Sequence, residues 1–322
     1  MDRMIDFESV HISEDIRDAF FDQLHRIAEK DARVMLLTAD MSAFSLERYK
    51  RELPQQYVNV GIAEQNLINI AAGLAKMGKK VFVYGIAPFV TMRCYEQIKI
   101  VTEMNLDIHI IGAGAGLSYG SDGYTHHAVQ DIGIMRLLRG LRIYNPSDSV
   151  SSAAAAYAAY YGHGPSYTRI DKGRFPLIHG SAVWERLIQK GVVSINEGTD
   201  VTLLSTGFMV QQALAITEAL AAQSIQAGLI DVFQLNPLCA EELNSAIGNS
   251  KKLVTIEEHE RAGGLGTMVS EWLVDQRRMT PLKRVAIDAQ PQGYGDRPWL
   301  HQMLGLDTAS LTRKIMEFLN VK

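Results

Sequence analysis

Residues 80–112 read KVFVYGIAPFVTMRCYEQIKIVTEMNLDIHIIG, and this stretch decides the fold class. An apolar run at 80–84 is followed by an amphipathic segment at 92–104, and a second apolar run follows at 108–112. Two strands joined by a crossover of helix length lie parallel in one sheet, because antiparallel neighbours need only a short turn. The stretch therefore predicts a β–α–β unit whose helix covers one face of a parallel sheet.

The same alternation continues in both directions along the chain. Apolar strand-like runs alternate with amphipathic helix-like runs almost from one end of the sequence to the other. We therefore predict an α/β protein with mostly parallel sheets and helices on both faces. Further strands are predicted at 34–38, 141–144, 166–170, 201–205, 227–232, 253–257 and 284–287, and further helices at 14–30, 63–77, 149–160, 209–223, 240–247, 264–277 and 311–319.

The alternation pauses between residues 171 and 198, where Gly173 and Pro176 interrupt the pattern. Glycine and proline are the strongest local breaks in regular structure, so we interpret this stretch as a linker. The chain of 322 residues is long enough for two domains, since domains cluster near ~100–150 residues. We predict two three-layer α/β domains, 1–185 and 186–322.

Composition narrows the function classes. A net charge of −4 and the absence of a Lys/Arg cluster leave no basic surface for nucleic acid. Cys94 and Cys239 stand far apart, which excludes a disulfide framework and a zinc knuckle. The first ten residues, MDRMIDFESV, hold no apolar signal-peptide core. We expect a cytoplasmic protein.

Residues 59–66 read NVGIAEQN and place Glu64 at the start of a predicted helix. The helix dipole favours an acidic residue in the first turn, so a capping role is one interpretation. The helix that follows is apolar on most faces and is predicted to be buried. A carboxyl group at the mouth of a buried helix can instead exchange protons with a ligand. Spacing alone leaves both interpretations open.

Residues 112–127 read GAGAGLSYGSDGYTHH and follow a predicted strand. Ligands bind at the carboxyl ends of strands in open α/β sheets, which favours a binding role for this loop. Its glycines do not fall as G-x-G-x-x-G, so it is no dinucleotide fingerprint. In an extended loop His126 and His127 point in different directions, and we expect only one to face the site. Asp122 can orient a histidine or bind a substrate hydroxyl.

Two further side chains follow predicted strands. Phe89 is an ordinary core residue by type, but its place after a strand leaves room for stacking on a planar ring. Arg169 lies at the end of the predicted strand 166–170, where it can hold a phosphate or simply face solvent. The sequence has no Walker A loop, H-E-x-x-H motif or G-x-S-x-G elbow. The residues alone indicate an α/β protein with a ligand loop rich in glycine and histidine.

Taken in this order, the segments resemble the transketolase family, above all the C-terminal subunits of split transketolases and the matching part of deoxyxylulose-phosphate synthase. The runs GIAEQ at 61–65 and DGYTH at 122–126 together carry the resemblance, which spans nearly the whole chain. Supporting stretches are TADM at 38–41, AAGLA at 71–75, APF at 87–89 with Arg93 and EQI at 96–98, GP at 164–165 and EEH at 257–259 followed by GGLG at 263–266.

The resemblance implies thiamine diphosphate as the cofactor. Glu64 matches the glutamate that hydrogen-bonds N1′ of the cofactor's aminopyrimidine and so helps to remove the thiazolium C2 proton. Phe89 matches the aromatic residue that stacks on that pyrimidine. Asp40 and Met41 match positions that line the thiazolium side. These are expected cofactor contacts.

The resemblance also implies the substrate contacts. His126 matches a histidine that contacts substrate hydroxyl or carbonyl oxygens and shuttles protons. Asp122 matches a substrate-hydroxyl contact, and Arg169 matches a phosphate-binding arginine. The expected reaction is the transfer of a two-carbon ketol unit from a ketose to an aldose.

A missing motif implies a partner. The diphosphate domain of the family carries a Gly-Asp-Gly motif that binds Mg²⁺ and the cofactor's diphosphate, and this sequence contains no Gly-Asp-Gly. The expected chain is therefore a pyrimidine-binding domain plus a transketolase C-terminal domain, with Mg²⁺ held by an N-terminal transketolase subunit. Symmetric pairing predicts an α₂β₂ assembly.

Two other functions remain open. The β subunit of a 2-oxoacid dehydrogenase E1 has the same two domains, although the DGYTHH loop at 122–127 argues against it. A non-catalytic scaffold subunit would keep the fold and lose the chemistry. The presence of Glu64, Phe89 and His126 together argues against that role.

Overall fold

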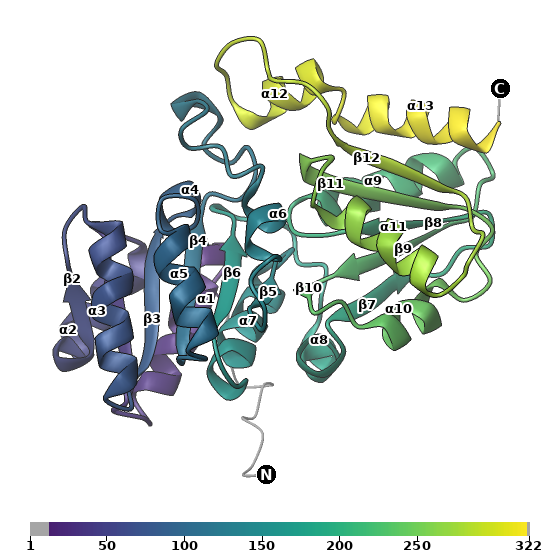
Figure 1. The fold of residues 1–322 in the computed structure, drawn as a ribbon. Coiled ribbons are helices and arrows are strands. Elements are labelled where there is room, and N and C mark those ends of the chain that lie inside the picture. Colours follow the sequence, from purple (N-terminus) through teal and green to yellow (C-terminus); the bar gives the residue numbers. More distant parts are fainter. Residues whose placement is uncertain (1–12, 321–322) are drawn as a thin grey trace.

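The computed structural model describes residues 13–320, which form two α/β halves side by side (Figure 1). Each half is a twisted sheet covered by helices on both faces, and the chain passes from one half to the other near α8 (Trp184–Lys190). The expected class, two α/β domains with mostly parallel sheets, is confirmed.

The first sheet has seven strands in the order β10-β5-β6-β4-β3-β1-β2. Its neighbours run parallel, except that β10 pairs antiparallel with β5 at one edge. The carboxyl ends of the parallel strands therefore meet along one side of the sheet. The strands are β1 (Val34–Thr38), β2 (Tyr57–Asn59), β3 (Lys80–Ile86), β4 (Ile108–Ala113), β5 (Arg142–Tyr144), β6 (Ser166–Ile170) and β10 (Gln234–Asn236).

Helices cover both faces of this sheet because alternate residues of the central strands are apolar on both sides. Val81 and Val83 of β3 pack towards α3 and α5, whereas Phe82 and Tyr84 pack towards α1 and α7. This is the pattern of a parallel strand that is buried on both faces. The helices of this half are α1 (Ile16–Ala28), α2 (Phe44–Glu52), α3 (Glu64–Lys76), α4 (Ala87–Val90), α5 (Tyr95–Glu103), α6 (Asp131–Met135) and α7 (Ser149–Tyr161).

The second sheet has five strands in the order β12-β11-β8-β9-β7, of which only β7 runs antiparallel to its neighbour. Helices α9 and α13 cover one face, and α10 and α11 cover the other. The elements are β7 (Val192–Asn196), β8 (Val201–Ser205), α9 (Met209–Ala221), β9 (Ala227–Val232), α10 (Ala240–Ile247), β11 (Leu253–Glu260), α11 (Leu265–Asp275), β12 (Leu282–Ile287), α12 (Arg297–Leu304) and α13 (Thr308–Leu319).

Three short strands differ from the sequence expectation. β2 has only three residues, and none of them is buried, so no apolar run marks it. β7 lies inside the stretch interpreted as a linker, where Gly191 immediately precedes it. β10 lies within the second half in sequence, between β9 and α10, but joins the edge of the first sheet, a pairing that no local pattern encodes. Among residues 13–320, no helix is long and apolar enough to cross a membrane.

Candidate active site

Three loops of the first half meet at the carboxyl edge of its sheet. Glu64 follows β2, Phe89 follows β3, and the loop of residues 114–127, here called the glycine–histidine loop, follows β4. This loop rises from the sheet edge towards α12 of the second half (Figure 1). The four strands lie side by side in the order β4-β3-β1-β2, so their carboxyl ends bring these loops together. Open α/β sheets bind ligands at this edge.

Glu64 is the first residue of α3, and only 6% of it is exposed. The preceding residue, Ala63, has no side chain that caps the helix, so the helix dipole at this end favours the carboxylate. Arg93 donates from Nη1 to Oε2 of Glu64 over 2.8 Å. Gln65 in turn donates to the Arg93 carbonyl oxygen (3.2 Å) and so ties α3 to the start of α5. A buried carboxylate with one charged partner therefore faces this edge.

Phe89 stands beside that ion pair. The Arg93 guanidinium lies over the Phe89 ring at 4.3 Å from its centroid, a cation–π contact. The ring of His126 approaches from another side, with the centroids 5.1 Å apart and the planes at 65°. Glu64, Arg93, Phe89 and His126 thus form one connected group, although the sequence separates them by up to 62 positions (126 − 64).

The two histidines of the loop have different surroundings. His126 is partly exposed, with Thr125 Oγ1 3.0 Å from its Nδ1 and the Tyr119 ring 6.0 Å away. His127 is buried, and its Nε2 donates to the Gly120 carbonyl oxygen over 3.2 Å. His127 therefore holds the loop in shape, whereas His126 has a face open to a ligand.

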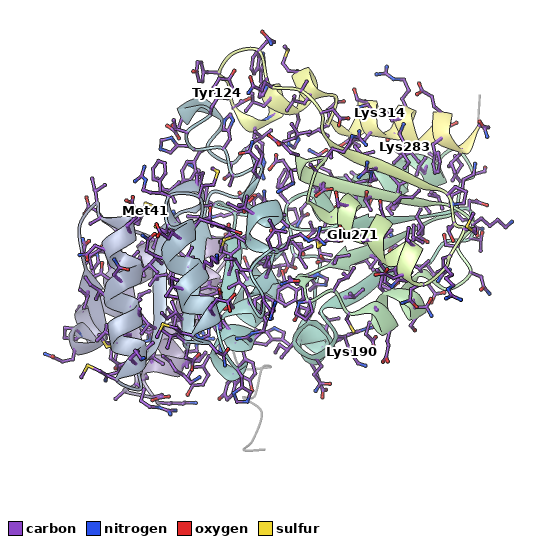
Figure 2. All side chains as sticks on the ribbon, viewed as in Figure 1. Met41, Tyr124, Lys190, Glu271, Lys283 and Lys314 are labelled. Carbon is purple, nitrogen blue, oxygen red and sulfur yellow. The ribbon has the colours of Figure 1, made fainter. Side chains whose placement is uncertain are left out.

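Asp122 is exposed at the end of the short 3₁₀ turn Gly120–Asp122. Its neighbour Tyr124 is labelled in Figure 2 at the top of the glycine–histidine loop. Tyr124 donates its hydroxyl to the Pro291 carbonyl oxygen over 2.7 Å, which fixes the loop against the second half. The contact of the exposed Asp122 with a substrate hydroxyl remains a prediction.

Asp40 and Met41 follow β1 at the same edge, where Figure 2 labels Met41. Asp40 has a positive φ of 54°, and its backbone N–H donates to Asn59 Oδ1 over 3.0 Å. The same amide oxygen accepts from the Gly61 N–H (3.0 Å). Met41 is partly buried and packs on the core beneath α1. Their contacts with a cofactor remain a prediction.

Arg169 is buried at the interface of the two halves. Its guanidinium is buried and donates to Asp131 Oδ2 (2.8 Å) and to the carbonyl oxygens of Ala128 (2.6 Å) and Glu258 (3.0 Å). The Tyr167 hydroxyl donates to the same Asp131 oxygen. A buried guanidinium bonded to these acceptors joins the two halves, which argues against a phosphate-binding role for Arg169.

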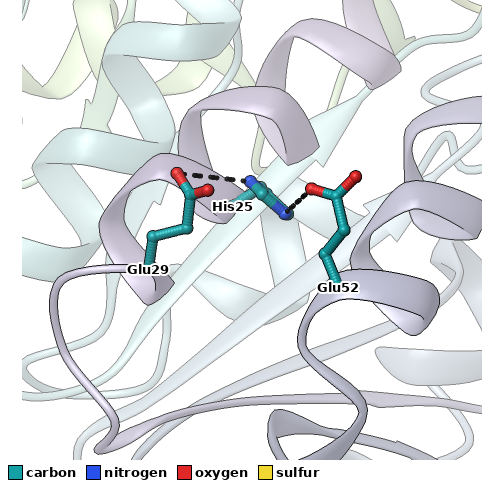
Figure 3. A group of neighbouring side chains, drawn as sticks. All are labelled: His25, Glu29 and Glu52. Atoms are coloured by element: carbon teal, nitrogen blue, oxygen red, sulfur yellow. Dashed lines mark ion pairs between the residues drawn. The ribbon is translucent and has the colours of Figure 1, made fainter.

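One cluster outside this site has side chains of the metal-binding type. His25 lies between Glu29 and Glu52, with nitrogen–oxygen distances of 3.6 Å and 3.1 Å (Figure 3). Arg48 and Arg51 both donate to Glu52 over 2.9 Å. Two guanidinium groups already neutralise this carboxylate and repel a cation, so the cluster is better explained as an ion-pair network.

Several residues that hold this site escape prediction from the sequence. Arg93 stands out there only as part of a matching stretch, and its contact with Glu64 depends on the packing of α3 against α5. Glu258 and Arg297 lie in the second half, yet they contact the glycine–histidine loop. The EEH run at 257–259 marks Glu258 in the sequence, but nothing in the run reveals that this residue contacts the glycine–histidine loop.

Comparisons with known proteins identify the domains of both halves. The family model described as "Transketolase, pyrimidine binding domain" matches residues 13–176, and "Transketolase, C-terminal domain" matches residues 190–311. The chain is 31% identical over 304 residues to one of the subunits of the apulose-4-phosphate transketolase of Phocaeicola vulgatus, covering 94% of this chain and 96% of that protein. It is 32% identical over 304 residues to the 6-deoxy-6-sulfo-D-fructose transketolase subunit SqwH of Clostridium sp. strain MSTE9, covering 94% of each.

A solved structure shares the whole architecture. It is described as a split gene transketolase, an inactive β₄ tetramer, and it superposes with a TM-score of 0.84 at 28% identity. The match covers 96% of this chain and 99% of that one. The pyrimidine-domain match spans half of the sequence, and relatives above 30% identity match it nearly end to end. The chain belongs to the transketolase family.

Proposed function

We propose that this chain is the catalytic subunit of a split transketolase, a glycolaldehyde transferase that moves a two-carbon ketol unit from a ketose to an aldose. The observation that carries the proposal is the connected group of Glu64, Arg93, Phe89 and His126 at the carboxyl edge of the first sheet. A scaffold subunit would have no need to keep a buried carboxylate, an aromatic face and a partly exposed histidine together.

The residues present fit thiamine diphosphate. An aminopyrimidine needs a hydrogen-bond partner for a ring nitrogen and an apolar face to stack on. Glu64 offers a carboxylate that is 6% exposed, and Phe89 offers a ring joined to it through Arg93. Asp40 and Met41 would line the other end of the cofactor. When bound, thiamine diphosphate supplies the nucleophilic carbon that carries the two-carbon unit.

The chain's own groups would orient the reactants and move protons. Glu64 holds and passes a proton at the pyrimidine nitrogen, which is general acid–base work for a fixed carboxyl group. His126 is held by Phe89 and Thr125 and presents its open face to a substrate hydroxyl or carbonyl oxygen. Asp122, at the mouth of the site, accepts a hydrogen bond from a sugar hydroxyl.

The proposal includes a partner. Relatives are named as subunits of transketolases, and the structural neighbour that contains this kind of chain alone is described as inactive. We infer that an N-terminal transketolase subunit supplies Mg²⁺ and the diphosphate site, in an α₂β₂ heterotetramer. The described residues of this chain include no cluster of carboxylates at the proposed site that would replace that metal centre.

The substrates are proposed to be anionic sugars. Two relatives are named for a phosphorylated sugar and for a sulfonated sugar, both of which carry a negative group. Because Arg169 is committed to Asp131, the group that binds this anion must be another cation of this chain or of the partner.

The test is reconstitution. The chain is mixed with the N-terminal subunit, thiamine diphosphate and Mg²⁺, and ketol transfer is measured with phosphorylated and sulfonated ketoses. We expect turnover only when both subunits are present, and loss of turnover with Glu64→Ala. Turnover by the chain alone, or an unchanged rate with Glu64→Ala, contradicts the proposal. Reductive acylation of a lipoyl domain by the complex would instead identify a 2-oxoacid dehydrogenase subunit.

A further inference from the structure

Glu258 connects the second half of the molecule to the glycine–histidine loop of the first. It lies near the end of β11 and is 3% exposed. Its carboxylate accepts from Arg297 Nε (2.8 Å) and Nη2 (2.6 Å) and also pairs with His301, both on α12. The same carboxylate accepts from the backbone N–H of Leu117 over 2.9 Å. One buried side chain thus joins α12 to the base of the loop that carries His126.

Arg297 makes the complementary contacts. Its Nη2 pairs with Asp171, just after β6, over 2.7 Å and lies 3.4 Å from the Ala115 carbonyl oxygen. Its guanidinium also lies over the Phe208 ring at 3.7 Å from the centroid. Arg297 therefore contacts the first half at two points, the base of the loop and the residue that follows β6. Breaking such a buried network leaves an uncompensated charge.

The glycines of the loop fit this interface. A Cβ on Gly116 would stand 1.8 Å from Glu258 Oε2, and one on Gly120 would stand 2.6 Å from the Gly295 carbonyl oxygen. A Cβ on Gly123 would meet the Tyr294 ring at 2.3 Å. No side chain can enter these spaces without a shift of the loop or of the group that it faces. The glycine density that indicates a ligand loop is therefore also explained by close docking on the second half.

The network stays charged. Burial alone raises the pKa of Glu258, but Arg297 and His301 outweigh it and hold that pKa well below its ordinary value. Two carboxylates, Glu258 and Asp171, share the Arg297 guanidinium, so a neutral residue in its place removes this ion pair from Asp171 and leaves Glu258 with His301 as its charged partner. The contacts are thus held by charge as well as by fit.

We propose that Glu258 and Arg297 are positioning residues: they hold Ala115 to Leu117, and through them the glycine–histidine loop, so that His126 faces the substrate. The sugar-binding geometry of the first half is then set by the second. This inference rests on the proposed function in its assignment of His126. The mobility of the loop, however, is a property of the chain itself and can be measured without any reaction.

The first measurement is amide hydrogen exchange of the full chain. Arg297→Met is compared with wild type and with Arg136→Met, which breaks another ion pair between the halves, Arg136 with Glu271, without touching the loop. We expect at least about tenfold faster exchange in peptides covering 114–127 for Arg297→Met only, because local opening follows the loss of fixing contacts. If peptides 114–127 exchange at the same rate in Arg297→Met as in Arg136→Met, the proposal is wrong.

The second measurement is steady-state kinetics of the reconstituted complex. Arg297→Met should raise the KM for the sugar about tenfold or more, while the Kd for thiamine diphosphate, measured by fluorescence titration, stays within about twofold. A general loss of stability would lower the active fraction without changing the KM of the folded enzyme. Arg297→Lys, which keeps the charge, should recover part of the KM change.

Gly116→Ala tests the same contact from the loop side: it removes no charged group, but its Cβ would collide with Glu258 Oε2 and so force the loop and this carboxylate apart. It should speed exchange at 114–127 and raise the sugar KM as Arg297→Met does, and it covers the case in which Arg297→Met does not fold. If loop exchange responds but wild-type complex transfers no ketol unit, the proposed function fails while the loop contact stands. If wild type is active and neither variant changes exchange or KM, the positioning role is wrong.

Discussion

Glu64 combines burial, a helix N-terminus and a single charged partner, Arg93. If it passes a proton to the cofactor, an amide of the same shape cannot replace it. Glu64→Gln should therefore lower kcat of the reconstituted complex by about 10²–10⁴-fold, the usual range for a lost general acid–base group. Turnover is measured at saturating cofactor, so that weaker cofactor binding does not account for the loss.

Glu96→Gln is the matched control. Glu96 also lies in the first turn of a helix, α5, but it is exposed. If both glutamates only satisfied a helix dipole, the two amides would have the same small effect on stability and none on kcat. Equal kcat values for Glu64→Gln and Glu96→Gln would therefore indicate that Glu64 only caps its helix.

For Arg169 we predict an effect on stability, whereas for Glu64 we predict an effect on turnover. Its guanidinium donates to Asp131 and to two carbonyl oxygens, one in each half, and a lysine cannot reach all three. Arg169→Lys should lower the free energy of unfolding by about 2–4 kcal/mol, as expected when a buried charge loses its partners. Urea denaturation of the chain measures this, with the exposed Arg174→Lys as control.

A phosphate-binding Arg169 would behave differently. Stability would stay near that of wild type, and the KM would rise for phosphorylated sugars only. The sequence could not separate these cases, because an arginine at a strand end has the same pattern whether it faces solvent or the neighbouring domain. Short motifs mark Glu64, Phe89 and His126, so the sequence predicts them. Arg93, Glu258 and Arg297 act through contacts that only tertiary packing creates.

At the level of elements, the segment between the halves is held by a buried group. Ser147 donates to Asp231 over 2.6 Å, and His179 Nε2 lies 2.8 Å from the same Asp231 oxygen. The backbone N–H of His179 also donates to Asp148 Oδ2 over 2.8 Å. Ser147 and Asp148 follow β5, His179 precedes α8, and Asp231 belongs to β9. Three segments from both halves therefore meet at one histidine.

This histidine predicts a pH dependence. Burial lowers the pKa of His179, but the hydrogen bond to Asp231 and the nearby Asp148 outweigh it, so the pKa lies above its ordinary value of 6.5. A raised pKa means that the folded state holds the proton more tightly than the unfolded state. The stabilisation from His179 should be complete below about pH 6.5 and should be lost as pH rises through the raised value.

Urea denaturation between pH 6 and 9 tests this, with His179→Gln beside wild type. The wild-type free energy of unfolding should fall faster with pH than that of the variant, and the two curves should converge at high pH. His163→Gln, at an exposed histidine, should keep the wild-type slope. Parallel curves for wild type and His179→Gln would contradict the proton linkage.

Among the strands, the sequence predicts those that are buried in a sheet better than those at its edges. The strands β1, β3, β4, β6, β8, β9, β11 and β12 carry apolar runs because helices bury them, and each was predicted. β2, β10 and β7 are instead edge strands, and no residue of β2 is buried. Edge pairing depends on the rest of the sheet, so short edge strands leave little trace in the local sequence.

At the level of the whole molecule, the two halves are more closely joined than the expected division at residue 185 implies. β10 of the second half extends the first sheet, and one apolar cluster includes residues of both halves, among them Ile132, Met135, Leu204 and Leu265. Arg169 and Glu258 add buried polar contacts across the same interface. Two such halves should act as one rigid support for the loops at the carboxyl edge of the first sheet.

That edge also carries exposed apolar side chains. Ile62, two residues before Glu64, is 78% exposed, and Phe44, at the start of α2, is 86% exposed. Single exposed apolar residues are ordinary, but Ile62 is only two positions from the carboxylate that the proposed cofactor must reach, and Phe44 begins the helix that follows β1. In the proposed assembly the N-terminal subunit covers this edge and buries them. Ile62→Asp should therefore weaken the assembly while it leaves the fold of the isolated chain intact.

Burial of one such side chain is worth about 1.5–3 kcal/mol, so the Kd for the N-terminal subunit should rise about 10- to 100-fold. Sedimentation velocity of the mixed subunits measures this, and thermal unfolding of the chain alone checks the fold. Met279→Asp is the control, because Met279 is 96% exposed and lies between α11 and β12 in the other half. If both aspartates weaken the complex equally, the loss reflects the added charge, and the N-terminal subunit binds elsewhere. If only Ile62→Asp weakens the complex, the N-terminal subunit binds over the proposed active site, to which it contributes the metal and diphosphate contacts.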